Sequence, residues 1–330
     1  MSSPLRDGKV LVTGAGGFIG SALVHRLQAE GAQVRAFLRY TSRAELGLLN
    51  LLPSQTRTPL DLVFGDLRDP DAVLKAAEGV AVVFHLGALI SIPYSYVHPV
   101  EVVHSNVLGT LNVLQACRAH GPRLVHTSTS EVYGTALQVP IPEDHPLQGQ
   151  SPYSASKIGA DMLVESYTRS FDVDAVTVRP FNTYGPGQTA RAVIPTIITQ
   201  ALSQDVIHLG SLDATRDFTY LTDTVNGFIK AAQTPGLTGQ TFNLGYGAEV
   251  SIGELAELII ELIGRPVQVE VDPERLRPDK SEVMRLLSDN SKARQVLGWQ
   301  PQVNLRTGLG LTIDWIREHL DLYRVGKYER

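Results

Sequence analysis

A tyrosine and a lysine four residues apart are the first side chains whose spacing suggests chemistry. Tyr153 and Lys157, in the run SPYSASK, would lie on one face of a helix. A phenol has a pKa of about 10 and is a weak base at neutral pH, but a nearby ammonium group favours its phenolate. The pair could therefore take a proton from an alcohol. Because the spacing is common, its meaning depends on the surrounding sequence.

A run rich in hydroxyl groups precedes this pair. Residues 127–134, TSTSEVYG, follow a predicted strand, so their side chains would emerge at the carboxyl end of a sheet, where α/β proteins bind ligands. Thr129 and Ser130 would face a substrate there. The carboxylate of Glu131 could remove a second proton, which simple oxidation or reduction does not require. The alternative is that Glu131 caps a turn or pairs with a lysine.

A glycine-rich loop near the N-terminus predicts a dinucleotide site. Residues 9–20, KVLVTGAGGFIG, combine a strand, a tight turn and the start of a helix. Glycines at this spacing let the backbone lie against a pyrophosphate, and N–H groups at the helix N-terminus would face that anion. The candidate cofactor residues of this loop are Gly14, Gly17, Phe18, Ile19 and Gly20.

Two later strand ends should line the same groove. Asp66 and Leu67 follow the third predicted strand, and Gly87 and Ala88 follow the fourth. They would contact the adenine and nicotinamide halves of the cofactor. The alternative for Asp66 is that it caps the helix that follows.

The end of the second strand bears on the choice between NAD and NADP. An acidic residue there would hold the ribose 2′-hydroxyl of NAD. The sequence FLRYTSR has no acid, whereas Arg39, Ser42 and Arg43 could hold a 2′-phosphate by charge-assisted hydrogen bonds. The sequence therefore favours NADP over NAD, unless both arginines are solvated surface residues.

The elements that must position these residues alternate through the first half of the chain. Strands that are apolar throughout, separated by helices, indicate a doubly wound parallel sheet of the α/β, Rossmann-like class with right-handed crossovers. The predicted strands are 9–13, 34–38, 62–64, 80–85, 123–127 and 175–179. The predicted helices are 21–30, 70–78, 100–120 and 154–170.

The alternation becomes less regular in the second half. We expect a dinucleotide-binding domain at 1–181 and a smaller mixed α/β lobe at 182–330 that binds the substrate, with 219–247 returning to the first domain. Ser251, with Glu254 three residues on, predicts a capping box, and Gly264 predicts the end of that helix. A last helix is predicted at 305–319.

Composition excludes several classes of function. The chain has 330 residues and a net charge of -5, which argues against a general nucleic-acid binder. Its one cysteine, Cys117, allows no internal disulfide, and its nine histidines show no zinc-like spacing, so no metal is expected. The sequence has no apolar run long enough to span a bilayer and no secretory core at its start, which predicts a soluble, cytoplasmic protein without a membrane partner.

Five motifs occur together and carry a family resemblance. TGAGGFIG, GDLRD, TSTSEVYG, SPYSASK and RPFNTYGP resemble the extended short-chain dehydrogenases/reductases, specifically the NAD(P)-dependent nucleotide-sugar epimerases and dehydratases. The T-S-E run is similar to that of GDP-mannose 4,6-dehydratases. Longer stretches such as RAVIPTIITQ and RPDKSEV are more similar to the 4,6-dehydratases of N-acetylglucosamine nucleotides in legionaminic acid pathways.

The resemblance implies roles for the residues already singled out. Thr129 and Tyr153 would bracket the C4 hydroxyl of the sugar, and Ser130 and Glu131 would take the places of the acid at C6 and the base at C5. Lys157 would hold the ribose of the cofactor. Ser130 departs from the aspartate of dTDP-glucose 4,6-dehydratases, which leaves Glu131, or a water held by Ser130, to protonate the leaving hydroxyl.

The implied reaction is oxidation at C4, loss of water across C5 and C6, and return of a hydride to C6. The cofactor would stay tightly bound and be regenerated in each turnover. UDP-glucuronate decarboxylases also carry the TSEVYG run, and nucleotide-sugar 4-epimerases use the same tyrosine and lysine without the glutamate, so both activities stay open. A non-catalytic nicotinamide-binding protein is a more distant alternative.

A nucleotide-sugar substrate carries a diphosphate, which arginines should bind. The resemblance assigns this role to Arg216 and Arg277; surface ion pairs are the alternative for each. The two helices at 100–120 and 154–170 resemble those that pair in homodimers of the family. The full set of candidate substrate residues is Ser91, Tyr94, Asn182, Arg191, Arg216 and Arg277, of which Ser91 and Tyr94 have loop packing as their alternative.

Overall fold

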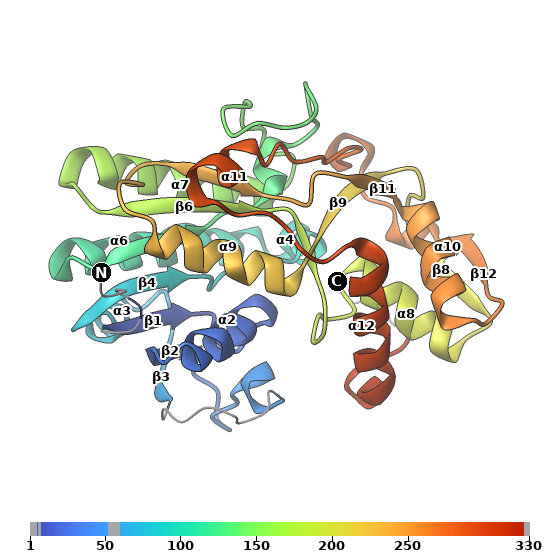
Figure 1. Cartoon of the computed structure of the whole chain (residues 1–330), viewed down its shortest axis with the longest axis horizontal. Helices are drawn as coiled ribbons and strands as arrows, with labels where there is room; N and C mark the ends of the chain where they lie inside the picture. Colours follow the sequence, from blue (N-terminus) through green and yellow to red (C-terminus); the bar gives the residue numbers. More distant parts are fainter. Residues whose placement is uncertain (1–4, 6–7, 52–59, 327–330) are drawn as a thin grey trace.

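A seven-stranded sheet forms the centre of the first lobe in the computed structural model, which describes Leu5 and residues 8–51 and 60–326 (Figure 1). Its order is β10-β6-β5-β4-β1-β2-β3, and every pairing is parallel. This confirms the predicted doubly wound α/β class. The strands are β1 (Lys9–Thr13), β2 (Gln33–Arg39), β3 (Asp61–Gly65), β4 (Val80–His85), β5 (Arg123–Thr127), β6 (Ala175–Pro180) and β10 (Thr241–Leu244).

Helices cover both faces of this sheet. Alternate residues of β1 explain why: Val10 and Val12 pack into the core on one face, and Leu11 packs into the core on the other. Burial on both faces requires strands that are apolar throughout, which is the pattern that the sequence shows. One face carries α2 (Phe18–Ala29), α9 (Leu221–Gln233) and α11 (Ser291–Leu297); the other carries α3 (Pro70–Ala76), α6 (Gly109–His120) and α7 (Pro152–Phe171).

The long helix predicted at 100–120 is divided. It begins as α5 (Pro99–Val103), widens into a π-helical turn at His104–Leu108 and continues as α6. A short helix, α4 (Ile92–Val97), precedes it. The widened turn contains the buried Asn106, whose contacts with the loop after β4 are described below. A turn of this kind often marks a functional position in a helix.

The second lobe has its own core and lies at one end of the sheet (Figure 1). A three-stranded sheet has the order β11-β9-β7, and a two-stranded sheet pairs β12 with β8. Although β10 follows β9 in the chain, it pairs with β6 in the first lobe; the proposed division at residue 181 stays a prediction. The remaining elements are β7 (Asn182–Tyr184), α8 (Val193–Ser203), β8 (Val206–Leu209), β9 (Thr215–Tyr220), β11 (Glu249–Ser251), α10 (Ile252–Ile263), β12 (Gln268–Val271) and α12 (Leu305–Glu318).

The predicted start and end of the helix that follows Ser251 are confirmed. Ser251 and Glu254 form a reciprocal capping box at the start of α10, and Gly264 ends the helix in the left-handed conformation. Cys117 is buried, and burial raises the pKa of its thiol to about 12. Trp299 is a core residue whose indole N–H donates to the carbonyl of Asp223. None of the described helices is long and apolar enough to cross a membrane.

Replacing Ser251 with alanine tests the capping box. The variant leaves the N–H of Glu254 without its acceptor, so we expect Tm to fall by about 2 °C. Ser203→Ala, at the exposed end of α8, is the matched control and should leave Tm unchanged. Differential scanning calorimetry of both variants measures the difference, and equal Tm values would contradict a stabilising cap.

Candidate active site

Two glycines in and beside the loop between β1 and α2 leave no room for a Cβ atom. Gly14 has a φ of +68°, and a Cβ there would lie 2.8 Å from the backbone nitrogen of Gly87. A Cβ on Gly20 would lie 2.1 Å from the carbonyl oxygen of Gly14. No side chain caps α2, which begins at Phe18 after Gly17, so its first N–H groups can donate to an anion. The loop therefore fits the pyrophosphate of a dinucleotide.

The loops after β3 and β4 continue this groove. A Cβ on Gly87 would lie 2.7 Å from Cδ1 of Leu67, and Ala88 follows in the same half-buried loop. Asp66 pairs with Arg68 at 2.6 Å, and its hydrogen bonds with Arg68 are the main reason why its pKa is lowered. The cap of α3 is Asp69, so the alternative that Asp66 caps this helix is wrong.

The three residues predicted to hold a 2′-phosphate lie at the end of β2 and in the turn that follows it. Nη2 of Arg39 lies 3.9 Å from Oε1 of Glu101, on α5. Ser42 and Arg43 are exposed in the turn that follows the strand. Of the three residues predicted to hold a 2′-phosphate, Arg39 thus faces a carboxylate.

The start of α7 fixes the tyrosine and the lysine. Ser151 and Ser154 form a capping box around Pro152, so the helix begins immediately before Tyr153. Tyr153 is buried at the carboxyl end of the sheet, 7% exposed. Lys157, one turn further on, is also buried, and its Nζ donates to the carbonyl of Thr127 at 2.6 Å.

The electrostatics of the pair differ from the prediction. We expected the charge of Lys157 to lower the pKa of Tyr153; instead burial raises the pKa of this phenol, and a hydrogen bond with Thr129 only partly opposes the rise. Burial is the main cause of the raised pKa, and the amino group of Lys157 donates instead to the Thr127 carbonyl. Burial also lowers the pKa of Lys157 to about 8, against the attraction of Asp161.

Asp161 is a buried residue that sequence reasoning missed. Its carboxylate accepts hydrogen bonds from the hydroxyl of Ser128 at 2.8 Å and from Nη2 of Arg179 at 3.0 Å, and Nε2 of His126 lies 3.1 Å away. These contacts tie α7 to β5 and β6. The available signal was spacing: Asp161 follows Lys157 by four residues, on the same helix face.

Glu131 lies beside Tyr153 on the short turn after β5. The hydroxyl of Thr129 accepts from the backbone N–H of Glu131 at 3.3 Å, so Thr129, rather than Glu131, caps this turn. The side chain of Glu131 is half-buried, and its charge acts on both Tyr153 and Arg216. Ser130 is buried beneath, 3% exposed. The structure thus brings the predicted acid–base residues together.

Two arginines from the second lobe approach this group. The side chain of Arg216, 7% exposed, donates to Glu282 at 3.2 Å, and Arg277 lies 3.8 Å from the same carboxylate oxygen. Burial is the main cause of the lowered pKa of Arg216; Arg277 lowers it further, whereas Glu131 and Glu282 raise it. Within the part of the chain that the structure describes, Nη1 of Arg277 and Oδ1 of Asn182 are buried without a hydrogen-bond partner.

The remaining predicted substrate residues, Ser91, Tyr94 and Arg191, lie in and before the helices α4 and α8. The hydroxyl of Ser91 caps α4 by accepting from the N–H of Tyr94. The Tyr94 hydroxyl donates to Oε2 of Glu101 at 2.5 Å. Arg191 lies in an exposed turn before α8. The side-chain hydrogen bonds of Ser91 and Tyr94 are therefore within α4 and with α5.

Asn106 is a second residue that sequence reasoning missed. Its side chain accepts from the N–H of Leu89 at 2.8 Å and donates to the hydroxyl of Ser156 at 2.9 Å. Ser156 in turn donates to the carbonyl of Tyr153 at 2.7 Å. The π-helical turn thus joins the loop after β4 to the helix that carries the tyrosine. The only indication of Asn106 in the sequence was a polar residue within an otherwise amphipathic helix pattern.

Histidines within the sheet have structural contacts. His85 Nδ1 lies 2.8 Å from the Thr13 hydroxyl, and Nε2 lies 3.1 Å from that of Thr110. Burial lowers the pKa of His85 and of His126. Across the described ranges, no group of three or more His, Cys, Asp or Glu side chains is placed to hold a metal ion.

The chain is similar to enzymes that act on nucleotide sugars. Residues 11–312 match the protein family described as GDP-mannose 4,6 dehydratase. The UDP-glucose 4-epimerase of Mycolicibacterium smegmatis is 38% identical over 317 residues, which cover 94% of this chain and 98% of that protein.

Solved structures agree with this similarity. The dTDP-glucose 4,6-dehydratase DesIV of Streptomyces venezuelae, solved with NAD, gives a TM-score of 0.87 at 30% identity over 96% of this chain and 99% of that chain. MoeE5, solved with UDP-glucuronic acid and NAD, gives a TM-score of 0.84 at 31% identity over 94% and 100%. Similar proteins therefore bind NAD and nucleotide sugars in this fold.

Gly20→Ala tests the fit of the glycine loop to a dinucleotide. The added Cβ would lie 2.1 Å from the Gly14 carbonyl oxygen, so the loop must shift and NAD affinity should fall at least tenfold, an effect of about 1.4 kcal/mol. Gly310→Ala, in α12 with open space around its Cβ, is the matched control. Isothermal titration calorimetry gives both affinities. An unchanged affinity in the Gly20 variant would contradict the assignment.

The charge of Asp161 should control the protonation of Lys157. Asp161→Asn removes the attraction that opposes burial, so the pKa of the Lys157 amine should fall further below its value of about 8. NMR titration of side-chain-labelled lysines measures it, with the signal assigned by its loss in Lys157→Met. Glu165→Gln, exposed on the same helix, is the control. An unchanged or raised pKa in the Asp161 variant would refute the role.

The same pKa has a consequence for stability. Because the folded pKa of about 8 lies below the ordinary value of 10.5, unfolding takes up a proton between these values. The contribution of Lys157 to the free energy of unfolding should therefore rise with pH through this window. Chemical denaturation at several pH values measures the slope, and Lys157→Met should lack this contribution.

Proposed function

Because the chain belongs to the extended short-chain dehydrogenase/reductase family of NAD-dependent nucleotide-sugar epimerases and dehydratases, we propose that it is a nucleotide-sugar 4,6-dehydratase acting on UDP- or GDP-N-acetylglucosamine. The position of Glu131 beside Tyr153 carries this proposal. Epimerisation at C4 needs one proton acceptor, whereas dehydration needs a second one at C5. The choice of sugar rests on the resemblance of RAVIPTIITQ and RPDKSEV to dehydratases of that substrate.

Tyr153 is the group that accepts the proton of the C4 hydroxyl. Its phenol is buried beside Thr129, which supplies a hydrogen bond that favours the charged form. Lys157, one turn further along α7, would donate to the ribose of the cofactor. NAD or NADP would accept the hydride from C4 and return it to C6, leaving no net change in the cofactor.

Glu131 is the base at C5. Two carboxylates influence Tyr153, but Asp161 is buried and already accepts hydrogen bonds from Ser128 and Arg179. Glu131 is half-buried on the turn after β5. It takes the proton from C5 and delivers it to the C6 hydroxyl, which leaves as water; a proton from solvent later returns to C5. Buried Ser130 is the other candidate for contact with the leaving group.

The arginines of the second lobe bind the diphosphate. Arg216 and Arg277 share the carboxylate of Glu282. Among the described residues, Nη1 of Arg277 and the side-chain oxygen of Asn182 are buried without a hydrogen-bond partner. Buried polar atoms of this kind favour a site that a polar ligand completes. A phosphate oxygen would accept a hydrogen bond from Nη1 of Arg277.

A homodimer is part of the proposal. Exposed apolar side chains lie along α5, the π-helical turn and α7, on the helices that resemble the pairing surface of the family. They are Val100, Val103, Leu108 and Met162.

Epimerisation at C4 is the second candidate. The identity of 38% to a UDP-glucose 4-epimerase favours it. It predicts a product of unchanged mass, whereas a UDP-glucuronate decarboxylase would release carbon dioxide.

Glu131→Gln tests the proposed dehydration. The variant keeps the shape of the side chain but lacks the base, so formation of the dehydrated sugar should fall by at least about a thousandfold while NAD affinity is retained. Mass spectrometry of UDP- and GDP-N-acetylglucosamine, GDP-mannose and UDP-glucuronate incubated with the enzyme and either cofactor measures the products.

Glu257→Gln, exposed on α10, is the control and should turn over normally. Loss of water by the unaltered enzyme and not by the Glu131 variant is the expected result. Full activity of the Glu131 variant would refute its role. Loss of carbon dioxide, or a product of unchanged mass with a new retention time, would replace the dehydratase by the decarboxylase or the epimerase.

A further inference from the structure

Four charged side chains gather where β2 and β3 end beside α5. Arg39 lies 3.9 Å from Glu101, and Arg68 lies 2.6 Å from Asp66. The two pairs are coupled, because the charge of Arg39 also lowers the pKa of Asp66 and that of Glu101 raises the pKa of Arg68. Two carboxylates therefore balance the two guanidinium groups of this cluster.

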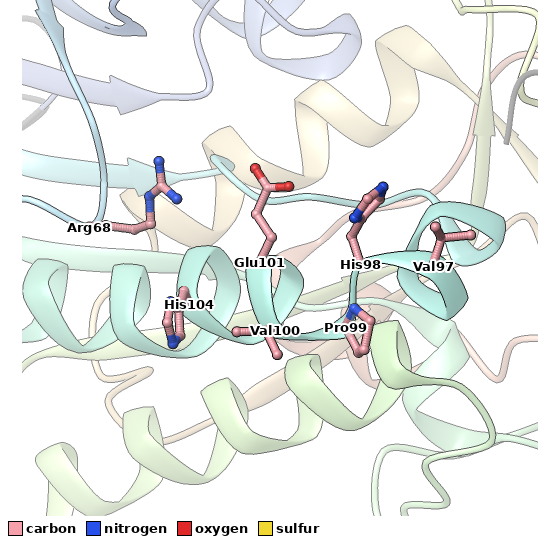
Figure 2. A pocket seen from close by; sticks show the side chains of 7 residues that line it. All are labelled: Arg68, Val97, His98, Pro99, Val100, Glu101 and His104. Atoms are coloured by element: carbon pink, nitrogen blue, oxygen red, sulfur yellow. The ribbon is translucent and has the colours of Figure 1, made fainter.

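A pocket of about 400 Å³ opens beside this cluster. Figure 2 shows Arg68 and Glu101 projecting toward the same side of α5, with His98 beside them. The pocket is lined by Arg68, Val97, His98, Pro99, Val100, Glu101 and His104.

The carboxylate of Glu101 is held in place from a second side. The hydroxyl of Tyr94 donates to Oε2 at 2.5 Å, while Oε1 faces Arg39. The ring of Tyr94 in turn packs on His98, with centroids 4.6 Å apart. A carboxylate fixed in this way cannot turn away when a second anion approaches.

The cluster lies where dinucleotide-binding folds recognise the adenosine ribose of the cofactor. In dinucleotide-binding folds, the residue at the end of the second strand faces the 2′ position of the adenosine ribose. Arg39 is the last residue of β2. A 2′-phosphate bound there would therefore share Arg39 with Glu101 and would lie near two carboxylates.

We propose that Glu101 determines cofactor specificity by disfavouring the 2′-phosphate and so selecting NAD over NADP, an inference that rests on the proposed function. The phosphate carries nearly two negative charges at neutral pH. An Arg39 without an acidic neighbour would attract it, whereas Glu101 beside Arg39 offsets part of that attraction. NAD has only a hydroxyl group at this position, so Glu101 does not repel it.

The test is the affinity of the full chain for both oxidised cofactors. Isothermal titration calorimetry gives Kd for NAD and NADP with the unaltered protein and with Glu101→Gln. NADP should bind about tenfold more tightly to the variant, while NAD changes by less than about threefold. Glu30→Gln, which removes a carboxylate paired with Arg26 on α2, is the matched control and should change neither affinity.

Two further measurements separate charge from structure. The gain should shrink as salt is raised, because Arg39 and Glu101 are 65% and 30% exposed and their charges are screened. Tyr94→Phe keeps the charge but frees the carboxylate, so it should give a smaller gain in NADP affinity. A ratio of affinities unchanged in the Glu101 variant, with NAD still bound, would overturn this inference alone. If neither cofactor bound the unaltered chain, the proposed function would fail, and this inference with it.

Discussion

The buried carboxylate of Asp161 is the constraint on which the rest of the site depends. It lies between two buried cations, Lys157 and Arg179, and none of these three charges is stable away from water unless the others are in place. Its hydrogen bonds reach β5 through Ser128 and β6 through Arg179. The middle of the helix that carries the tyrosine is thereby fixed to the carboxyl ends of two strands.

The two carboxylates of the site differ in exposure, and we assign them different roles. Asp161 is buried, accepts hydrogen bonds from Ser128 and Arg179, and serves as a fixed charge. Glu131, half-buried on the turn that Thr129 caps, faces Tyr153 on one side and Arg216 of the second lobe on the other. The proposed acid–base chemistry would therefore take place between Tyr153 of the first lobe and Arg216 of the second.

Much of this could be predicted from sequence because it depends on local patterns. Apolar strands, the glycine loop and the capping box of Ser251 each follow from neighbouring residues, and the structure contains them at the expected positions. What could not be predicted depends on distant partners. The amino group of Lys157 bonds a carbonyl of β5, and Tyr94 bonds Glu101 on another helix. Spacing along the chain does not report such contacts, nor the burial that raises the pKa of Tyr153.

The central claim, that Glu131 exchanges a proton with C5 during loss of water, is tested most directly by turnover in heavy water. The sugar nucleotide is isolated, returned to ordinary water and examined by NMR and mass spectrometry for deuterium bound to carbon. The account predicts a product that has lost one water and carries deuterium at C5. A dehydrated product without deuterium at C5 would contradict the exchange, and a product of unchanged mass without deuterium would contradict the dehydratase itself.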